Sequence, residues 1–146
     1  MALPILYFDV TRAILEHDRI IKVSGGMAGT KDEGQLCSVL EHIKNDLYYP
    51  SFEEKLNHLV FSIVKFHAFN DGNKRSSLVL GAYFLAINGY SHCVPQFIRE
   101  MENIVVWVAD GKISKQLLLK IVTSLIAEDD YPEVVKLELI EVLSKQ

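Results

Sequence analysis

Cysteine is scarce in this chain, and its two copies, Cys37 and Cys93, lie far apart without forming a CxxC pair. We therefore expect both to be reduced core residues of an intracellular protein. His42, His58 and His92 have no metal-ligand spacing either, and we expect them to be ordinary surface or core residues.

Long apolar runs and an excess of positive charge are also missing. The longest uncharged apolar run, residues 78–87, is about half of what a membrane-crossing helix needs. Residues 1–8 are apolar but lack the basic start and the cleavage site of a signal peptide. The net charge is −4, from 15 Lys and Arg against 19 Asp and Glu, which does not favour nucleic-acid binding. We therefore expect a cytoplasmic protein without a membrane or nucleic-acid partner.

The chain has 146 residues, of which 49% are hydrophobic, enough for one domain with a substantial core. It shows no repeat, linker or low-complexity tract. We expect residues 1–146 to form a single domain.

Apolar residues recur at intervals of three and four along most of the chain, which predicts an all-α fold. Ser51 and Glu54 form a capping-box pattern at the start of one helix, and Asn88-Gly89 ends the next. Thr30 or Asp32 begins an earlier helix. The predicted helices cover residues 10–23, from Thr30 or Asp32 to about Tyr48, 52–66, 73–87, 95–109, 114–127 and 132–145. The helix over 73–87 is apolar nearly all round, so we expect it to be central.

Glycine gathers between the first two predicted helices, at Gly25, Gly26 and Gly29. Three glycines in five residues favour positive φ angles and interrupt regular structure. We expect a loop or a small hairpin here, near residues 24–31.

The segment His67–Arg75, with the sequence HAFNDGNKR, lies between two apolar helices. The start of a helix offers backbone N–H groups and a positive dipole end to an anion. Gly72 allows close approach of the backbone, while Lys74 and Arg75 would neutralise phosphate oxygens. Asn73 would either cap the helix or bind phosphate.

Two further residues of this segment supply reactive groups. Asp71, beside the phosphates, suits a Mg²⁺ ion that bridges phosphate oxygens. His67 ends the preceding helix and can accept a proton near neutral pH. Each residue alone is common in turns and on surfaces. Together they predict a loop that binds ATP and transfers one of its phosphorus groups to a protein hydroxyl.

The segment resembles the core motif of the Fic/Doc family, HxFx[DE][GA]N[GK]R, from His67 to Arg75. A second segment, with His17-Asp18, Gly25-Gly26, Gly29, Asp32 and Gly34, resembles the N-terminal half of Doc-type (death-on-curing) toxins. The likeness spans about residues 12–127. It implies a compact helical bundle with a flap loop or hairpin, and modification of protein hydroxyls that depends on ATP and Mg²⁺. It also implies that His67 is the base, Asp71 the Mg²⁺ ligand, and Asn73, Lys74 and Arg75 phosphate binders.

Two positions distinguish the branches of that family. Members that transfer AMP carry Gly where this chain has Lys74, and Arg where it has Leu78; Doc-like members resemble this chain at both. The resemblance thus implies transfer of the γ-phosphoryl group of ATP to a Ser or Thr, and the best-understood member of the branch modifies elongation factor Tu. AMP transfer by the same fold, and a non-catalytic helical binding or regulatory domain, remain as alternatives.

Toxins of this kind are usually neutralised by a small antitoxin, and we expect such a partner. Self-inhibition through Ser124 and Glu128, which resemble part of the [ST]xxxE[GN] motif, is disfavoured because Leu78 replaces the Arg that the Glu would bind. The extra helix over 132–145 is unusually apolar. Core packing explains it, or an interface with the antitoxin or with a second copy in a homodimer.

Overall fold

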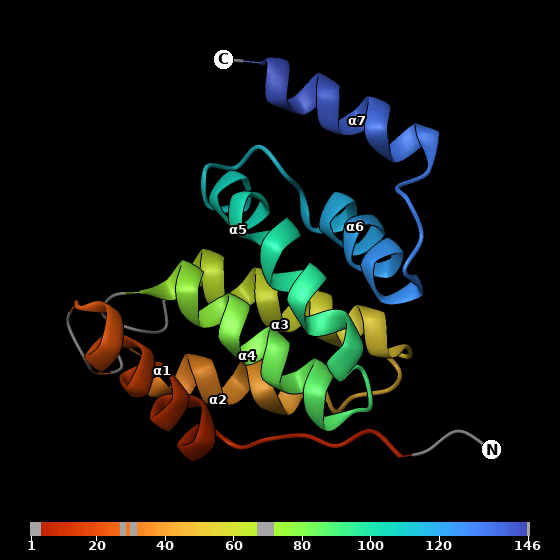
Figure 1. Cartoon of the computed structure of the whole chain (residues 1–146). Helices are drawn as coiled ribbons and strands as arrows, with labels where there is room; N and C mark the ends of the chain where they lie inside the picture. The colour runs from red at the N-terminus through yellow and green to blue at the C-terminus, as the bar shows by residue number, and fades with distance from the viewer. Residues whose placement is uncertain (1–3, 27–28, 30–31, 67–71, 146) are drawn as a thin grey trace.

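The computed structural model describes residues 4–26, 29, 32–66 and 72–145, and the regular elements of this part of the chain are all helical (Figure 1). They are α1 (Val10–Ser24), α2 (Glu33–His42), α3 (Phe52–Phe66), α4 (Asn73–Ile87), a short 3-10 turn η1 (Ser91–Cys93), α5 (Val94–Ala109), α6 (Lys115–Ala127) and α7 (Glu133–Ser144). The all-α prediction is confirmed. In the connection between α1 and α2, the described residues form a loop and no strand.

Most helix boundaries follow the capping signals of the sequence. The side chain of Asp32 accepts a hydrogen bond from the backbone N–H of Gln35 at 2.9 Å and caps α2, while Thr30 lies outside the described residues. Ser51 Oγ accepts from the N–H of Glu54 at 3.1 Å at the start of α3. Asn88 is the C-cap of α4.

The prediction that the second helix continues to Tyr48 is wrong, because α2 ends at His42. Asn45 causes the difference. Its side-chain oxygen accepts the backbone N–H groups of Leu47 at 2.9 Å and of Tyr48 at 3.3 Å. Asparagine competes in this way with the helical backbone pattern and favours a turn.

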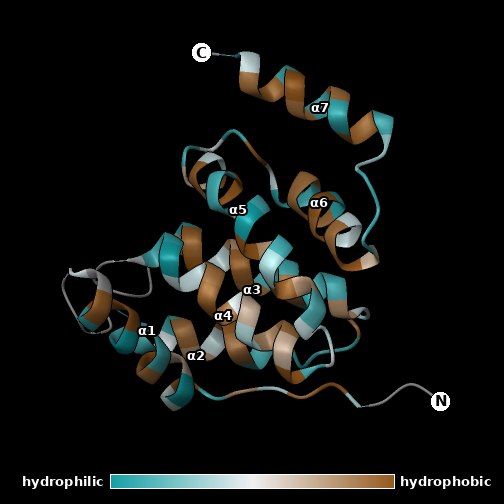
Figure 2. Ribbon diagram, viewed as in Figure 1, coloured by the Kyte–Doolittle hydropathy of each residue, from teal (hydrophilic) through white to brown (hydrophobic). Residues whose placement is uncertain are grey.

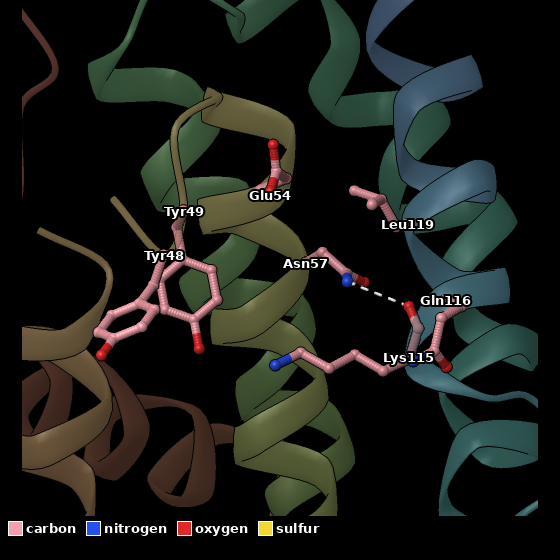
Figure 3. Close-up of a pocket in the computed structure, with 7 residues that line it drawn as sticks. All are labelled: Tyr48, Tyr49, Glu54, Asn57, Lys115, Gln116 and Leu119. Carbon is pink, nitrogen blue, oxygen red and sulfur yellow. Dashed lines mark hydrogen bonds between the residues drawn. The ribbon is translucent and has the colours of Figure 1, made fainter. Parts of the chain in front are cut away.

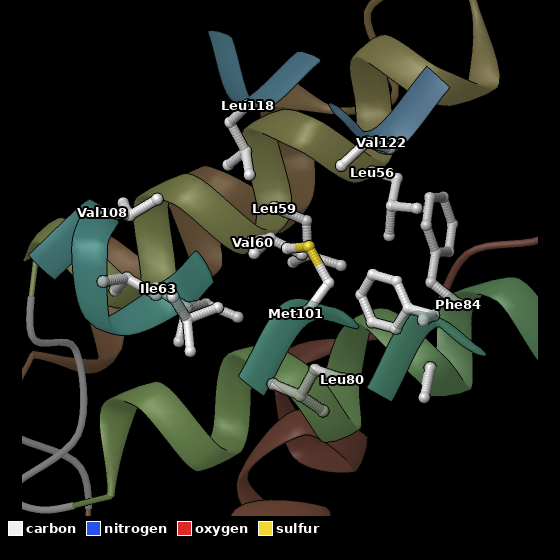
Figure 4. Close-up of a cluster of buried hydrophobic side chains, with 14 of the residues drawn as sticks. Leu56, Leu59, Val60, Ile63, Leu80, Phe84, Met101, Val108, Leu118 and Val122 are labelled. Carbon is white, nitrogen blue, oxygen red and sulfur yellow. The ribbon is translucent and has the colours of Figure 1, made fainter. Parts of the chain in front are cut away.

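Helices α3 and α4 lie at the centre of the bundle. The central position of α4 was expected, because residues 73–87 are apolar on nearly every side of the helix. Figure 4 shows Met101 of α5 clustered with Leu59 of α3 and Leu80 of α4, all fully buried. Gly81 allows this close packing, since a Cβ there would lie 2.9 Å from Phe97 Cζ and 3.1 Å from Val60 Cγ2. Any larger residue would push α4 away from both neighbouring helices.

The end of α3, the start of α4 and the connection between α1 and α2 come together at one end of the molecule, on the left in Figure 1. A side-chain contact confirms this proximity, because Arg75 Nη1 lies 3.4 Å from the carbonyl oxygen of Gly25. The fold therefore places Arg75, at the end of the HAFNDGNKR motif, next to Gly25 of the glycine-rich segment.

Helix α7 lies at the edge of the molecule, where it contacts α6 (Figure 1). Its Val135 is buried, but Val134, Leu137 and Ile140 are 67%, 58% and 65% exposed, and Figure 2 shows hydrophobic residues along much of the helix. Core packing thus explains one face of α7 only.

The two cysteines differ in their surroundings. Cys93 is buried, as expected, whereas Cys37 is exposed on α2, so the prediction of a core position for Cys37 is wrong. In the described part of the chain, no helix combines the length and the apolar character needed to cross a membrane.

Candidate active site

The start of α4 has the geometry of an anion-binding helix terminus. Gly72 is the N-cap in the left-handed conformation, with φ 71° and ψ 27°. A Cβ at this position would lie 2.7 Å from Ile21 Cδ1 of α1, so glycine is required both by its conformation and by the packing of α1 against α4. The first turn of α4 contains no acidic residue, and its N–H groups point out of the helix end. An anion would therefore meet no carboxylate from this turn.

Asn73 is the first residue of α4 and Gly72 its N-cap. The alternative in which Asn73 is the helix cap is therefore wrong, and its role as a phosphate binder stays a prediction. Ser76, one turn into α4, is fully buried, and its hydroxyl has no hydrogen-bond partner among the described residues. No pattern in the sequence marks Ser76 as a site residue.

The two cations of the motif occupy different surroundings. Lys74 is exposed, so its ammonium group can approach a ligand from solvent. Arg75 is partly buried, with Nη1 3.4 Å from the Gly25 carbonyl oxygen. The position of a Cβ on Gly72 would be 3.5 Å from Arg75 Nη2, so the guanidinium lies close to the helix cap. Arg75 thus lies between the start of α4 and the connection that follows α1.

This connection is fastened to α1 by Asp18. Its Oδ1 accepts the N–H of Gly29 at 3.3 Å and lies 3.1 Å from Nδ1 of His17, which is fully buried. Gly29 has φ 105°, a conformation that favours glycine. The spacing from His17-Asp18 to Gly29 therefore has a structural reason. Sequence alone could not assign this role, because the hydrogen bond joins residues 11 positions apart.

His67 and Asp71, the predicted base and metal ligand, lie outside the described residues. The structure gives the two ends of their segment: α3 ends at Phe66, and Gly72 caps α4. The roles of His67 and Asp71 stay predictions.

Comparison with known proteins agrees with this arrangement. Residues 7–85, more than half of the chain, match the Fic/DOC family. The chain belongs to the Fic/DOC family. The matched region begins before α1 and ends within α4, so it contains both the glycine-rich connection and the start of α4.

The chain is also similar to a protein named Protein kinase doc from Escherichia phage P1. The two are 32% identical over 103 residues, which cover 67% of this chain and 78% of the phage protein. The resemblance to the Doc branch is thereby confirmed.

A cavity of about 170 Å³ lies beside the first half of α3 (Figure 3). Asn57 of α3 donates a hydrogen bond from Nδ2 to the Lys115 carbonyl at 3.1 Å. The cavity is lined by Tyr48, Tyr49, Glu54, Asn57, Lys115, Gln116 and Leu119. The motif segment follows the opposite end of α3, so this cavity is separate from the candidate active site.

Lys115 and His58 form an unusual pair next to this cavity. Lys115 Nζ lies 2.8 Å from His58 Nδ1, and the ring of Tyr49 stacks on His58 with centroids 4.4 Å apart. Burial, with the charges of Lys115 and His42, lowers the pKa of His58 to about 4. Burial also lowers the pKa of Lys115. His58 is therefore neutral near pH 7 and accepts a hydrogen bond from Lys115.

Proposed function

We propose that this protein is a Doc-like kinase that transfers the γ-phosphoryl group of ATP to a Ser or Thr hydroxyl of a protein. The observation that carries the proposal is the start of α4, where Gly72 in a left-handed conformation precedes a first turn with two cations and no carboxylate. Such a terminus suits a triphosphate. Membership of the Fic/DOC family and similarity to the phage protein support it.

Phosphoryl transfer is favoured over AMP transfer by two residues of α4. The Lys74 side chain would fill part of the anion site where AMP-transferring members carry Gly, so a nucleotide would bind in the reverse direction, with its γ-phosphate near the base. Leu78 is partly buried and packs against the core, so no second Arg extends from that position. AMP transfer is the second candidate function.

The chemistry can be assigned to residues of the motif. The backbone at Gly72, with Asn73, Lys74 and Arg75, would hold the phosphates, and Asp71 would hold Mg²⁺, which neutralises charge on them. His67 would accept the proton of the target hydroxyl. The hydroxyl oxygen forms a bond to the γ-phosphorus, the bond from this phosphorus to the bridging oxygen breaks, and ADP leaves.

The α1–α2 connection is the proposed site for the target protein. It lies beside the start of α4, fixed by Arg75 and by Asp18. An extended target segment could align along this flap by strand addition. A cytosolic protein such as elongation factor Tu is the proposed target by family resemblance.

We also propose a small antitoxin as a partner, with a helix or tail that folds onto the toxin. The exposed apolar face of α7, formed by Val134, Leu137 and Ile140, is a surface available to this partner or to a second copy of the chain.

Expression in a bacterial host tests whether the function is catalytic. The parent chain should arrest growth, and His67→Ala and Asp71→Ala should abolish the arrest. Matched controls are His42→Ala and Asp130→Ala, which change exposed residues of the same types and should arrest growth like the parent. If His67→Ala and Asp71→Ala arrest growth as well as the parent, the protein acts by binding, and the non-catalytic alternative is correct.

A further inference from the structure

His92, Cys93 and Glu128 gather where η1 meets the end of α6. His92 Nε2 lies 3.3 Å from Glu128 Oε1, and Cys93 Sγ lies 3.7 Å from the same oxygen. The ligand atoms of all three residues lie within 4.8 Å of one another. They supply one nitrogen, one sulfur and one oxygen donor, from parts of the chain 35 positions apart.

These separations agree with a tetrahedral zinc site. Zinc binds His nitrogen and carboxylate oxygen at about 2.0–2.2 Å and Cys sulfur at about 2.3 Å, which places the donors about 3.3–3.6 Å apart. The nitrogen–oxygen separation of 3.3 Å lies in this range, and the sulfur–oxygen separation of 3.7 Å is close to its upper end. The third separation, between His92 Nε2 and Cys93 Sγ, is within 4.8 Å. The side chain of His92 is 60% exposed, so its ring can move to bring the nitrogen closer to the sulfur.

The backbone at Glu128 explains how its carboxylate reaches this place. Glu128 is the C-cap of α6, with φ 59° and ψ 29°, and it is the one non-glycine residue with positive φ in the described part of the chain. Glycine usually occupies such a position, because a side chain there costs about 1 kcal/mol. The left-handed turn places the Glu128 carboxylate beside Cys93, the residue that precedes α5.

We propose that His92 Nε2, Cys93 Sγ and the Glu128 carboxylate bind a Zn²⁺ ion, with water as the fourth ligand. A donor set with nitrogen and thiolate sulfur favours Zn²⁺ over Mg²⁺, so the site is distinct from the proposed Mg²⁺ site at Asp71. Binding replaces the thiol proton of Cys93, which passes to solvent. The ion joins the start of α5 to the end of α6 and stabilises the folded chain.

Cobalt(II) is the spectroscopic probe for the test. The purified full-length protein, freed of metal with a chelator, is titrated with Co²⁺. We expect a thiolate-to-cobalt charge-transfer band in the near ultraviolet and the intense visible bands of tetrahedral cobalt. One equivalent of Zn²⁺ should remove both and raise the thermal unfolding midpoint.

Variants assign the ligands. Cys93→Ser should abolish the charge-transfer band, and Glu128→Gln should weaken Co²⁺ binding at least tenfold. Cys37→Ser and His42→Gln, which change exposed residues of α2, should bind Co²⁺ like the parent. Circular dichroism of each variant establishes that it is folded, and the exposed Glu128 provides a test even if Cys93→Ser unfolds. The proposal is overturned if the parent shows no charge-transfer band, or if Glu128→Gln binds Co²⁺ as tightly as the parent.

Discussion

Arg75 Nη1 lies 3.4 Å from the carbonyl oxygen of Gly25, which joins the first turn of α4 to a loop 50 residues earlier in the chain. A second contact, from the N–H of Gly29 to Asp18 Oδ1 at 3.3 Å, fastens the same loop to α1. The proposed phosphate site and the proposed target site are therefore adjacent to each other. Changes to the loop should alter transfer to the target.

The loop contact at Asp18 can be tested by Asp18→Ala. Loss of the acceptor for the Gly29 N–H should cost about 1 kcal/mol in the free energy of unfolding, and it should slow transfer to the protein target while nucleotide affinity stays unchanged. Asp9→Ala is the matched control, because Asp9 caps the start of α1 through the Arg12 N–H at 2.9 Å. It should cost about 1 kcal/mol as well but leave transfer intact. Equal transfer rates for the two variants would show that the loop does not position the target.

Glycine at position 72 is required by the structure, so Gly72→Ala should both destabilise the protein and impair transfer. The alanine would be strained at φ 71° and would meet Ile21 Cδ1 at 2.7 Å, which together cost about 2–3 kcal/mol. Urea denaturation measures the change in the free energy of unfolding.

Gly89→Ala separates backbone strain from the clash. Gly89 has φ 87° but nothing within 4 Å of a Cβ, so this variant should cost about 1 kcal/mol and transfer phosphate normally. If Gly72→Ala is no less stable than Gly89→Ala, the close contact between Ile21 of α1 and Gly72 is contradicted.

His58 should make stability depend on pH between about 4 and 6.5. Its pKa in the folded protein is lowered to about 4, so in this interval the unfolded chain binds a proton that the folded chain does not. Stability is therefore complete above pH 6.5 and falls as the pH decreases toward 4. The full shift corresponds to about 3 kcal/mol, which access of solvent to the cavity reduces to about 1–2 kcal/mol. Urea denaturation at several pH values measures it, and His58→Gln should remove this part of the pH dependence.

Lys115→Met tests the cause of the pKa shift at His58. Removal of the ammonium group 2.8 Å from Nδ1 should raise the pKa of His58 and so weaken the pH dependence. Lys112→Met removes the charge of an exposed lysine from the loop before α6 and should leave the dependence unchanged. The same pH profile in both variants would contradict the Lys115–His58 contact.

The two faces of α7 should respond differently to an introduced charge. Val135→Asp places a carboxylate in a buried position and should cost about 3 kcal/mol or more. Leu137 is 58% exposed, so Leu137→Asp should change the stability of the monomer by less than about 0.5 kcal/mol. Thermal unfolding of dilute protein compares them. If Leu137→Asp is as destabilising as Val135→Asp, that face is covered in the isolated chain.

The sequence predicts the helices well because their signals are local. Ser51 and Asp32 cap the helices that they were expected to begin, and the apolar spacing identifies the buried faces. The second helix was predicted to continue too far, because apolar periodicity does not reveal the side-chain hydrogen bond by which Asn45 favours a turn.

Contacts between distant segments were not predictable in the same way. The proposed anion-binding roles of Gly72 and Arg75 follow from a contiguous motif, but the loop contact of Asp18 and the cluster at Glu128 depend on how helices pack. His92 was expected to be an ordinary residue because ligand spacing is visible in sequence only when the ligands are close along the chain.

The central claim is that the group transferred is the γ-phosphoryl group of ATP. Its most direct test incubates the purified protein and cell lysate with ATP labelled either at the α-phosphate or at the γ-phosphate, and follows the label on protein. We predict that γ-label alone appears on the target, and that His67→Ala abolishes it. Label from the α-phosphate alone would contradict the claim and establish AMP transfer instead.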